Sequence, residues 1–225
     1  MNDDALTRVS LEDGSGEVAF LVSTPAGASK GTLLLAHGAG AAMDSSFMNR
    51  FAGHATIAGV TVMRFEFRYM AERRDSGRKR PPPAAEKLVG EFRAALGAAL
   101  RMTEGPFVIG GKSLGGRVAA MVAGLDLDPR VGAVVCLGYP FHAAGDVGVT
   151  RLAPLEALRI PALVVQGERD PFGDRKEIEA LPALPKVRFV WSEDGSHDLA
   201  PRGGSPATWD GNLRDAAQAA AALIG

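Results

Sequence analysis

Short apolar runs along the chain alternate with longer segments whose apolar residues recur at helical spacing. Strands are predicted at residues 18–22, 32–36, 60–67, 107–109, 133–137, 162–165 and 187–191. Several of these runs are apolar throughout, which is typical of parallel strands covered on both faces. Residues 6–11 are a further candidate, for an edge strand.

Between these runs, apolar residues three or four positions apart predict helices. One stripe consists of Leu88, Phe92, Leu96 and Leu100, and another of Trp209, Leu213, Ala216, Ala220 and Leu223. Residues 45–57 are a third helical candidate. The alternation predicts an α/β fold in which a mostly parallel central sheet is covered by helices on both faces. No repeat or linker interrupts the pattern, so residues 1–225 are expected to form one domain.

The composition narrows the choice of partners and compartment. The net charge of −1 provides no overall field that would select nucleic acid or membrane, so neither is expected as a partner. Residues 1–4 lack the basic and then apolar order of a signal peptide, and no apolar stretch approaches the ~20 residues of a membrane span. We therefore predict a cytoplasmic protein. The single cysteine, Cys136, lies within an apolar run and is expected to be buried and inert.

The most informative segment, residues 107–116, joins a short strand, a G-x-S-x-G turn and an alanine-rich helix. In a parallel sheet, ligands collect at the carboxyl ends of the strands. A strand, a sharp turn and a helix in this order present a serine hydroxyl at that edge, so Ser113 is the predicted nucleophile. A second G-x-S-x-G match surrounds Ser29, but it precedes a strand and is predicted to be a loop.

A serine hydroxyl needs a base to accept its proton and an acid to orient that base. His197 lies in a polar loop between the last strand and the last helix, and it is the predicted base. His142 is the alternative base and a candidate for lining the site. His54 falls within a helical segment and is expected to be structural.

The acid is expected between the serine and the histidine in the sequence. Asp170 directly follows a buried strand and is the predicted acid. Asp146 is the best alternative, and Asp174 and Glu168 are further rivals. Each could instead be an ordinary turn residue.

Two backbone N–H groups are expected to stabilise the developing oxyanion. The N–H of Leu114 follows the nucleophile, and the N–H of Ala39 lies in the glycine-rich turn after the strand 32–36. Gly40 is the alternative to Ala39. The residues His37, Gly40 and Lys112 are further candidates for lining the site. Lys112 could contact the substrate or pair with a neighbouring carboxylate. This chemistry requires neither a metal nor an organic cofactor, and none is predicted.

The order of these elements resembles the α/β-hydrolase superfamily over nearly the whole chain. Residues 110–117, 138–142 and 166–173 further resemble small bacterial predicted hydrolases of the dienelactone-hydrolase-like branch. They also resemble a subunit of a eukaryotic histone acetyltransferase complex and its testis-expressed relative. The resemblance implies a triad of Ser113, Asp170 and His197. The chain differs in one respect from dienelactone hydrolases proper, which have a cysteine at the position of Ser113.

Two segments bear on the substrate. Only residues 138–159 separate two successive strands where many lipases insert a lid, so a minimal lid or none is expected, with an open site for small or terminal acyl groups. Residues 73–83 are read as a loop on the catalytic rim that carries Arg73, Arg74, Arg78, Lys79 and Arg80. One hypothesis is that this loop attracts an anionic substrate, and the alternative is an ordinary solvated loop.

The sequence thus predicts a serine hydrolase that cleaves an ester-type acyl bond of a small molecule through an acyl-enzyme. Thioester and peptide bonds remain open as substrates, as do the natural substrate and the oligomeric state. The alternative is a catalytically silent α/β-hydrolase scaffold that acts as a protein-interaction module.

Overall fold

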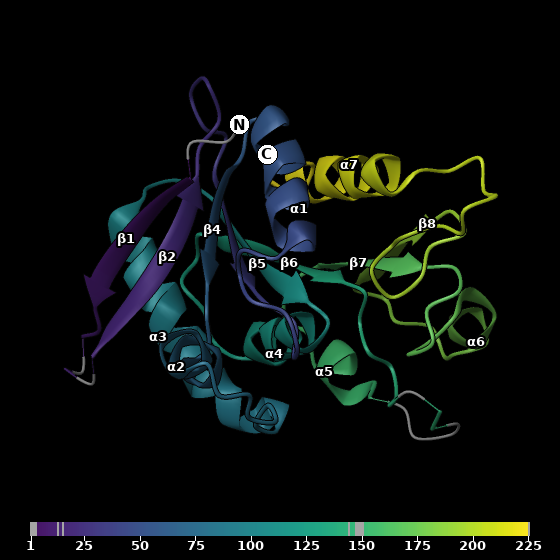
Figure 1. Ribbon diagram of the computed structural model, residues 1–225, viewed down its shortest axis with the longest axis horizontal. Coiled ribbons are helices and arrows are strands. Elements are labelled where there is room, and N and C mark those ends of the chain that lie inside the picture. Colours follow the sequence, from purple (N-terminus) through teal and green to yellow (C-terminus); the bar gives the residue numbers. More distant parts are fainter. Residues whose placement is uncertain (1–3, 13, 15, 144, 147–150, 225) are drawn as a thin grey trace.

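A computed structural model describes the chain except for residues 1–3, 13, 15, 144, 147–150 and 225. An eight-stranded sheet with the order β1-β2-β4-β3-β5-β6-β7-β8 runs through its centre (Figure 1). The strands are β1 (Asp4–Ser10), β2 (Glu17–Ser23), β3 (Thr32–Ala36), β4 (Thr61–Phe65), β5 (Phe107–Lys112), β6 (Val131–Leu137), β7 (Ala162–Gly167) and β8 (Val187–Ser192).

The sheet is mostly parallel, as predicted. The strands from β4 to β8 in the sheet order pair in parallel, and β1 and β2 form an antiparallel extension beside β4. The carboxyl ends of β3, β5 and β7 therefore meet at one edge of the sheet. This edge is where the predicted functional residues follow their strands.

Helices cover both faces of the sheet, and α1 and α7 lie on the opposite side from α4 and α5 (Figure 1). The helices are α1 (Ser46–Ile57), α2 (Arg68–Ser76), α3 (Ala85–Met102), α4 (Leu114–Ala123), α5 (Ala153–Glu156), α6 (Arg175–Glu179) and α7 (Trp209–Ala221). Alternation along β3 divides the core into two layers. Leu34 packs in the layer with α3 and α4, whereas Leu33 and Leu35 pack in the layer with α1 and α7.

Element boundaries differ from the predictions by a few residues. The strand predicted at 60–67 ends earlier, at Phe65, because Phe67 already caps helix α2. The candidate edge strand at 6–11 is β1, which begins and ends slightly earlier. Between β6 and β7, the described residues contain α5 as their helix, and no larger helical insertion covers the sheet edge there.

The prediction that the basic segment 73–83 is a loop is wrong in its first part. Arg73 and Arg74 belong to α2, which ends at Gly77 in the left-handed conformation with φ of 69°. Only Tyr69 and Met70 of this helix are buried, so the sequence has no apolar stripe that would indicate it. The short helix α6 was also not predicted.

Among the described residues, no helix combines the length and apolar character needed to cross a membrane.

Candidate active site

Ser113 occupies a sharp turn between the end of β5 and the start of α4. Its backbone has φ of 51° and ψ of −114°, a conformation that side chains with a Cβ rarely adopt. Two hydrogen bonds hold it there: its N–H donates to the carbonyl of Leu137 at 2.9 Å, and its carbonyl accepts from the N–H of Arg117 at 3.0 Å. Such strain typically costs about 1–3 kcal/mol and persists where the surroundings enforce it.

Gly115 allows helix α4 to begin directly against the end of β3. A Cβ at this position would lie 2.5 Å from the carbonyl oxygen of Ala36 and 2.6 Å from that of His37. The glycine two residues after the serine is therefore a steric requirement. Because Leu114 is the first residue of α4, its N–H has no acceptor within the helix and is available at the turn.

His197 connects the predicted serine and the predicted acid. Its Nε2 lies 2.9 Å from Ser113 Oγ, and its Nδ1 lies 2.8 Å from Asp170 Oδ2. The Asp170 side chain is fully buried. When Nδ1–H donates to the carboxylate, Nε2 is free to accept the serine proton, so this arrangement selects the tautomer that a general base requires.

Tertiary contacts fix the loop that carries His197. Leu199 has φ of 58°, yet its side chain is fully buried and anchors the loop in the core. The amide of Asn212, at the start of α7, donates to the carbonyl of Leu199 at 2.8 Å and to that of Glu193 at 3.1 Å. The loop thus holds the imidazole at a defined place above the sheet edge.

The rival carboxylates have other surroundings. Asp146 is exposed, and Asp174 caps α6 by accepting the N–H of Glu177 at 2.9 Å. Glu168 forms an ion pair with Arg175 at 3.0 Å. Of the four candidates, Asp170 is the carboxylate that the fold brings to His197.

The rival histidines are also bonded elsewhere. His142 Nδ1 donates to the carbonyl of Ala143 at 2.8 Å, and its Nε2 lies 3.4 Å from Glu177 Oε2. The hydrogen bond to the Ala143 carbonyl, and secondarily Glu177, raise the pKa of His142. His54 pairs with Asp210 at 3.0 Å on the surface.

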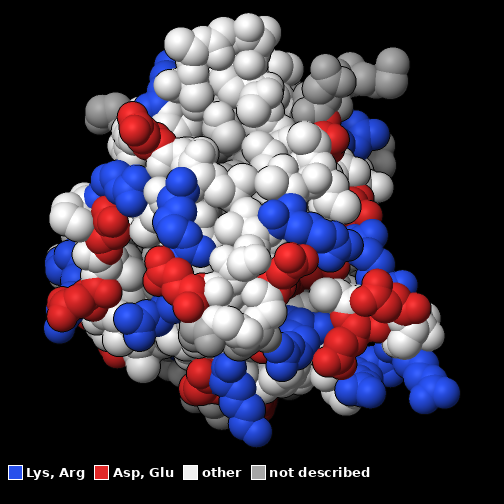
Figure 2. Space-filling view, turned by 90° about the vertical axis from the view of Figure 1, so that its left-hand side faces the viewer, with Lys and Arg blue, Asp and Glu red and all other residues white. Residues whose placement is uncertain are grey.

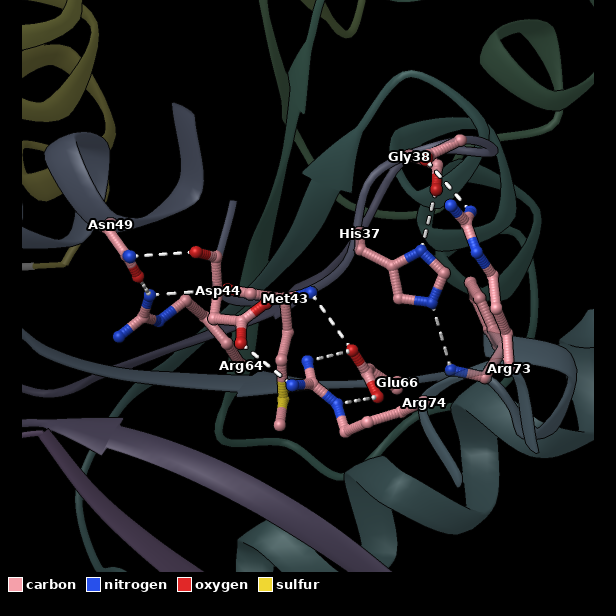
Figure 3. A network of polar contacts seen from close by, with 11 residues as sticks. His37, Gly38, Met43, Asp44, Asn49, Arg64, Glu66, Arg73 and Arg74 are labelled. Carbon is pink, nitrogen blue, oxygen red and sulfur yellow. Dashed lines mark hydrogen bonds and ion pairs between the residues drawn. The ribbon is translucent and has the colours of Figure 1, made fainter. Parts of the chain in front are cut away.

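His37 was expected to line the site. Its side chain instead turns away from the surface and into the protein. The side chain is fully buried; Nδ1 lies 2.6 Å from the Gly38 carbonyl, and Nε2 accepts the N–H of Phe67 at 3.2 Å (Figure 3). Since Nε2 is an acceptor, Nδ1 carries the proton and donates it to Gly38. Burial lowers the pKa of His37, which agrees with a neutral ring.

These contacts set the peptide groups of the turn after β3. The Gly38 carbonyl points toward His37, so the N–H of Ala39, on the opposite side of the same trans peptide, points away from it. Tyr69 Oη donates to the Ala39 carbonyl at 3.1 Å, and Arg73 donates to the Gly40 carbonyl at 3.3 Å. Side chains therefore orient three consecutive peptide groups.

This turn passes beside the serine. A Cβ on Gly38 would lie 3.7 Å from the Cβ of Ser113, so the peptide that follows Gly38 is next to the predicted nucleophile. Sequence analysis did not find Tyr69 or Phe67 as supports of the turn. No local pattern marks them, because they follow the neighbouring strand β4 and are distant from the turn in the sequence.

Residues 29–225 match a family model described as the alpha/beta hydrolase domain. The chain belongs to the α/β-hydrolase family. The fold is similar to an alpha-beta serine hydrolase homologue from Coxiella burnetii, with 18% identity over 100% of this chain and 99% of that chain and a TM-score of 0.68. It is also similar to an α/β serine hydrolase without a lid from Xanthomonas campestris, with 20% identity, 96% and 93% coverage and a TM-score of 0.66.

A dienelactone hydrolase from Anabaena variabilis is similar as well, with 24% identity over 98% of this chain and 96% of that chain and a TM-score of 0.67. The predicted α/β-hydrolase fold is thereby confirmed. The likeness to a histone acetyltransferase subunit stays a prediction.

The basic segment of this α/β-hydrolase is partly neutralised. Arg74 forms two contacts with Glu66, at 2.7 and 3.1 Å, and one with Asp44 at 2.9 Å (Figure 3). Arg80 pairs with Glu72 at 3.1 Å. Cationic and anionic side chains alternate over the face that carries β1, so no uniformly basic patch forms there (Figure 2).

Arg73 is the basic residue of this segment that contacts the turn after β3. It lines a small cavity of about 210 Å³ together with Gly40 and Met70. Lys112, the other candidate cation, is directed into the protein: its side chain is only 8% exposed, and its Nζ lies 3.2 Å from Asp198 Oδ1.

The structure also bears on metal binding and on the reactivity of the single thiol. Within the part of the chain that the structure describes, no three His, Cys, Asp or Glu side chains are arranged to hold a metal ion. Cys136 is fully buried, and burial raises the pKa of its thiol to about 12, which makes it unreactive as expected.

Proposed function

We propose that the protein is a serine hydrolase that cleaves an ester-type acyl bond through an acyl-enzyme. The observation that carries the proposal is the continuous hydrogen-bonded path from Asp170 through His197 to Ser113, with steps of 2.8 and 2.9 Å. Membership of the α/β-hydrolase family and the serine hydrolases among its structural neighbours support the same reaction class.

In the proposed reaction, Ser113 Oγ attacks the carbonyl carbon of the ester while His197 Nε2 accepts its proton. The buried carboxylate of Asp170 stabilises the resulting imidazolium and holds the ring in place. His197 then gives the proton to the departing alcohol oxygen as the carbon–oxygen bond breaks. A water molecule then attacks the acyl-enzyme while His197 accepts its proton. His197 passes this proton to Ser113 Oγ as the acyl–oxygen bond breaks, which releases the acid and restores the serine.

The negative charge on the carbonyl oxygen is proposed to be stabilised by the N–H groups of Leu114 and Ala39. The first is free of helix hydrogen bonds because of its position at the start of α4. The second is directed away from His37, and it follows Gly38, which lies close to Ser113. Both belong to backbone that is held before substrate arrives, which is the condition for effective oxyanion stabilisation.

The substrate is proposed to be a small acyl compound. The short connection between β6 and β7 supports an open site that accepts small or terminal acyl groups. Arg73, at the turn after β3, is the proposed contact for an anionic substituent, since Arg74 and Arg80 are already paired. We also propose that residues 1–225 act as one domain in the cytoplasm, in keeping with a single, buried cysteine.

Labelling with a fluorophosphonate tests this function. Labelling of the wild-type protein is expected, with loss in Ser113→Ala and in His197→Ala. The matched control is Ser29→Ala, which removes the other serine in a G-x-S-x-G match; Ser29 Oγ only bridges loop and strand groups, among them Thr61 Oγ1 at 2.9 Å. The Ser29 variant is expected to label normally and to hydrolyse p-nitrophenyl esters at the wild-type rate.

Two results of these assays would contradict the proposed function. Folded wild-type protein that neither labels nor hydrolyses a panel of acyl esters of different length and charge would favour the silent scaffold. Near-normal turnover by Ser113→Ala would exclude Ser113 as the nucleophile.

A further inference from the structure

Lys112 has an unusual position for a cationic side chain. It is the last residue of β5, directly before Ser113, and its side chain turns into the layer beneath α1. Its ammonium lies over the ring of Phe47, 5.3 Å from the ring centre, and 3.2 Å from Asp198 Oδ1. Burial lowers the pKa of Lys112, and the Asp198 carboxylate opposes this effect. A charge that is costly to bury is therefore held by one carboxylate.

That carboxylate belongs to the residue after His197. Asp198 is fixed at two points, because its carbonyl also accepts the indole N–H of Trp209 at 2.8 Å. Lys112 therefore ties the loop that carries His197 to the strand that carries Ser113. The ion pair bridges the two sides of the Ser113–His197 hydrogen bond.

Lys112 also lies close to the imidazole itself. Gly138, with φ of 63°, is close to both groups; a Cβ there would lie 3.3 Å from Lys112 Nζ and 3.4 Å from His197 Nδ1. The two nitrogens are thus within about 7 Å of each other. At that distance in a partly buried site, a unit charge alters the protonation of its neighbour measurably.

The charged and titratable groups around His197 come from several elements. Asp170 follows β7, Lys112 and Ser113 come from β5 and the turn after it, and Asp198 lies on the same loop. The ring of Phe172 packs on the imidazole, with centroids 4.4 Å apart. The carboxylates favour an imidazolium, and Lys112 is the cation among these groups that disfavours it.

We propose that Lys112 is a positioning residue for His197: it clamps the His197 loop through Asp198, and its ammonium opposes positive charge on the imidazole. The catalytic part of this inference rests on the proposed function. A base must be neutral to accept the serine proton. The Asp170 carboxylate stabilises positive charge on the ring, and the buried ammonium of Lys112 acts in the opposite sense.

The test is the pH profile of kcat/KM for p-nitrophenyl acetate. In Lys112→Met, which keeps length and loses charge, the acid limb is expected to move upward by about half to one pH unit. In Lys112→Arg, which keeps the charge, the limb is expected to stay near the wild-type position. In Asp198→Asn the acid limb is expected not to move to higher pH. In both Asp198→Asn and Lys112→Met, kcat is expected to fall because the ion pair that holds the His197 loop is lost.

A surface lysine provides the matched control. Lys30 donates to the Ala58 carbonyl at 2.9 Å in an exposed loop, so Lys30→Met is expected to leave both kcat and the acid limb unchanged. A purely structural role for Lys112 would lower kcat without moving the limb. An unmoved limb in Lys112→Met, or an equal rise in Asp198→Asn, overturns the proposal.

A second readout is independent of catalysis. NMR titration of the four histidines, with His197 assigned through His197→Gln, is expected to show the same upward move of the His197 midpoint in Lys112→Met. If the wild-type protein shows no hydrolysis or labelling, the proposed function fails while this titration still tests the electrostatic role of Lys112. If hydrolysis is normal and the midpoint does not move, only the role of Lys112 fails.

Discussion

Replacing Asp170 by asparagine keeps the shape of the side chain but exchanges one carboxylate oxygen for an NH2 group. The surrounding hydrogen bonds decide which oxygen is lost. Oδ1 accepts the N–H of Phe172 at 2.9 Å. Oδ2 accepts from His197 Nδ1 at 2.8 Å and from Gln166 Nε2 at 2.9 Å.

The amide oxygen is expected to stay beside Phe172, because an N–H left without an acceptor costs about 1–3 kcal/mol. Gln166 can do without Asp170, since its Nε2 also donates to the carbonyls of Tyr139 and Gly173, both at 3.1 Å. The new NH2 group then faces His197 Nδ1, which must accept. The ring proton moves to Nε2, and this nitrogen can no longer accept the proton of Ser113.

Other triads lose about 10⁴-fold in kcat when the acid becomes an amide, and the same loss is expected here. It corresponds to about 5.4 kcal/mol of transition-state stabilisation. The assay is kcat/KM for p-nitrophenyl butyrate, with the rate of fluorophosphonate labelling as a second measure and thermal unfolding as the check on folding.

The control is Asp146→Asn, which alters the exposed rival carboxylate and is expected to keep about the full wild-type activity. An Asp170→Asn enzyme that retained more than about a tenth of the wild-type kcat/KM would refute the tautomer argument. A comparable loss in Asp146→Asn would refute the assignment of the acid.

Three further outcomes are expected. Gly115→Ala should abolish labelling and lower expression of folded protein, because its Cβ would lie 2.5 Å from the Ala36 carbonyl oxygen. His37→Phe should lower the free energy of unfolding in urea by about 1–3 kcal/mol at pH 8. Burial holds the pKa of wild-type His37 below its unfolded value of 6.5, so the unfolded chain takes up a proton before the folded protein does. The free energy of unfolding of the wild-type protein should therefore decrease as the pH falls below 6.5. In His37→Phe this decrease should be smaller. Arg73→Gln should raise KM for anionic esters and not for neutral ones, and an equal effect of Arg74→Gln would contradict the assignment, since Arg74 is paired with Glu66.

The hydrophobic pattern was sufficient for the main elements. Continuous apolar runs are buried on both faces in the parallel strands, and the run at 32–36 coincides with β3. Helix α2 could not be found in this way, because it packs only Tyr69 and Met70 against the core and exposes Arg68 and Arg74. A helix without an apolar stripe gives no periodic signal in the sequence. The formation of α2 depends on the tertiary contacts of the segment that follows β4.

For the candidate site, too, local features could be predicted from the sequence and long-range contacts could not. The order of a serine elbow, an aspartate after a late strand and a histidine before the last helix is a local property, and the sequence alone supplied Ser113, Asp170 and His197 as candidates. Whether three residues so far apart in the chain meet is not local. The tertiary structure decided it by bringing Asp170, rather than Asp146, to the imidazole.

The same reason explains the residues that sequence analysis placed wrongly or passed over. His37 follows a strand at the catalytic edge, so its position suggested a role in lining the site, yet its side chain turns inward to Phe67. For Lys112 the sequence left substrate contact and pairing with a carboxylate open, and the fold brings it to Asp198. Strand periodicity gives the face on which a side chain lies but not the group it meets there. The sequence by itself determined most of the elements and the chemical groups of this α/β-hydrolase. Tertiary packing decided which groups touch, because hydrogen bonds act over about 3 Å between residues that lie far apart in the chain.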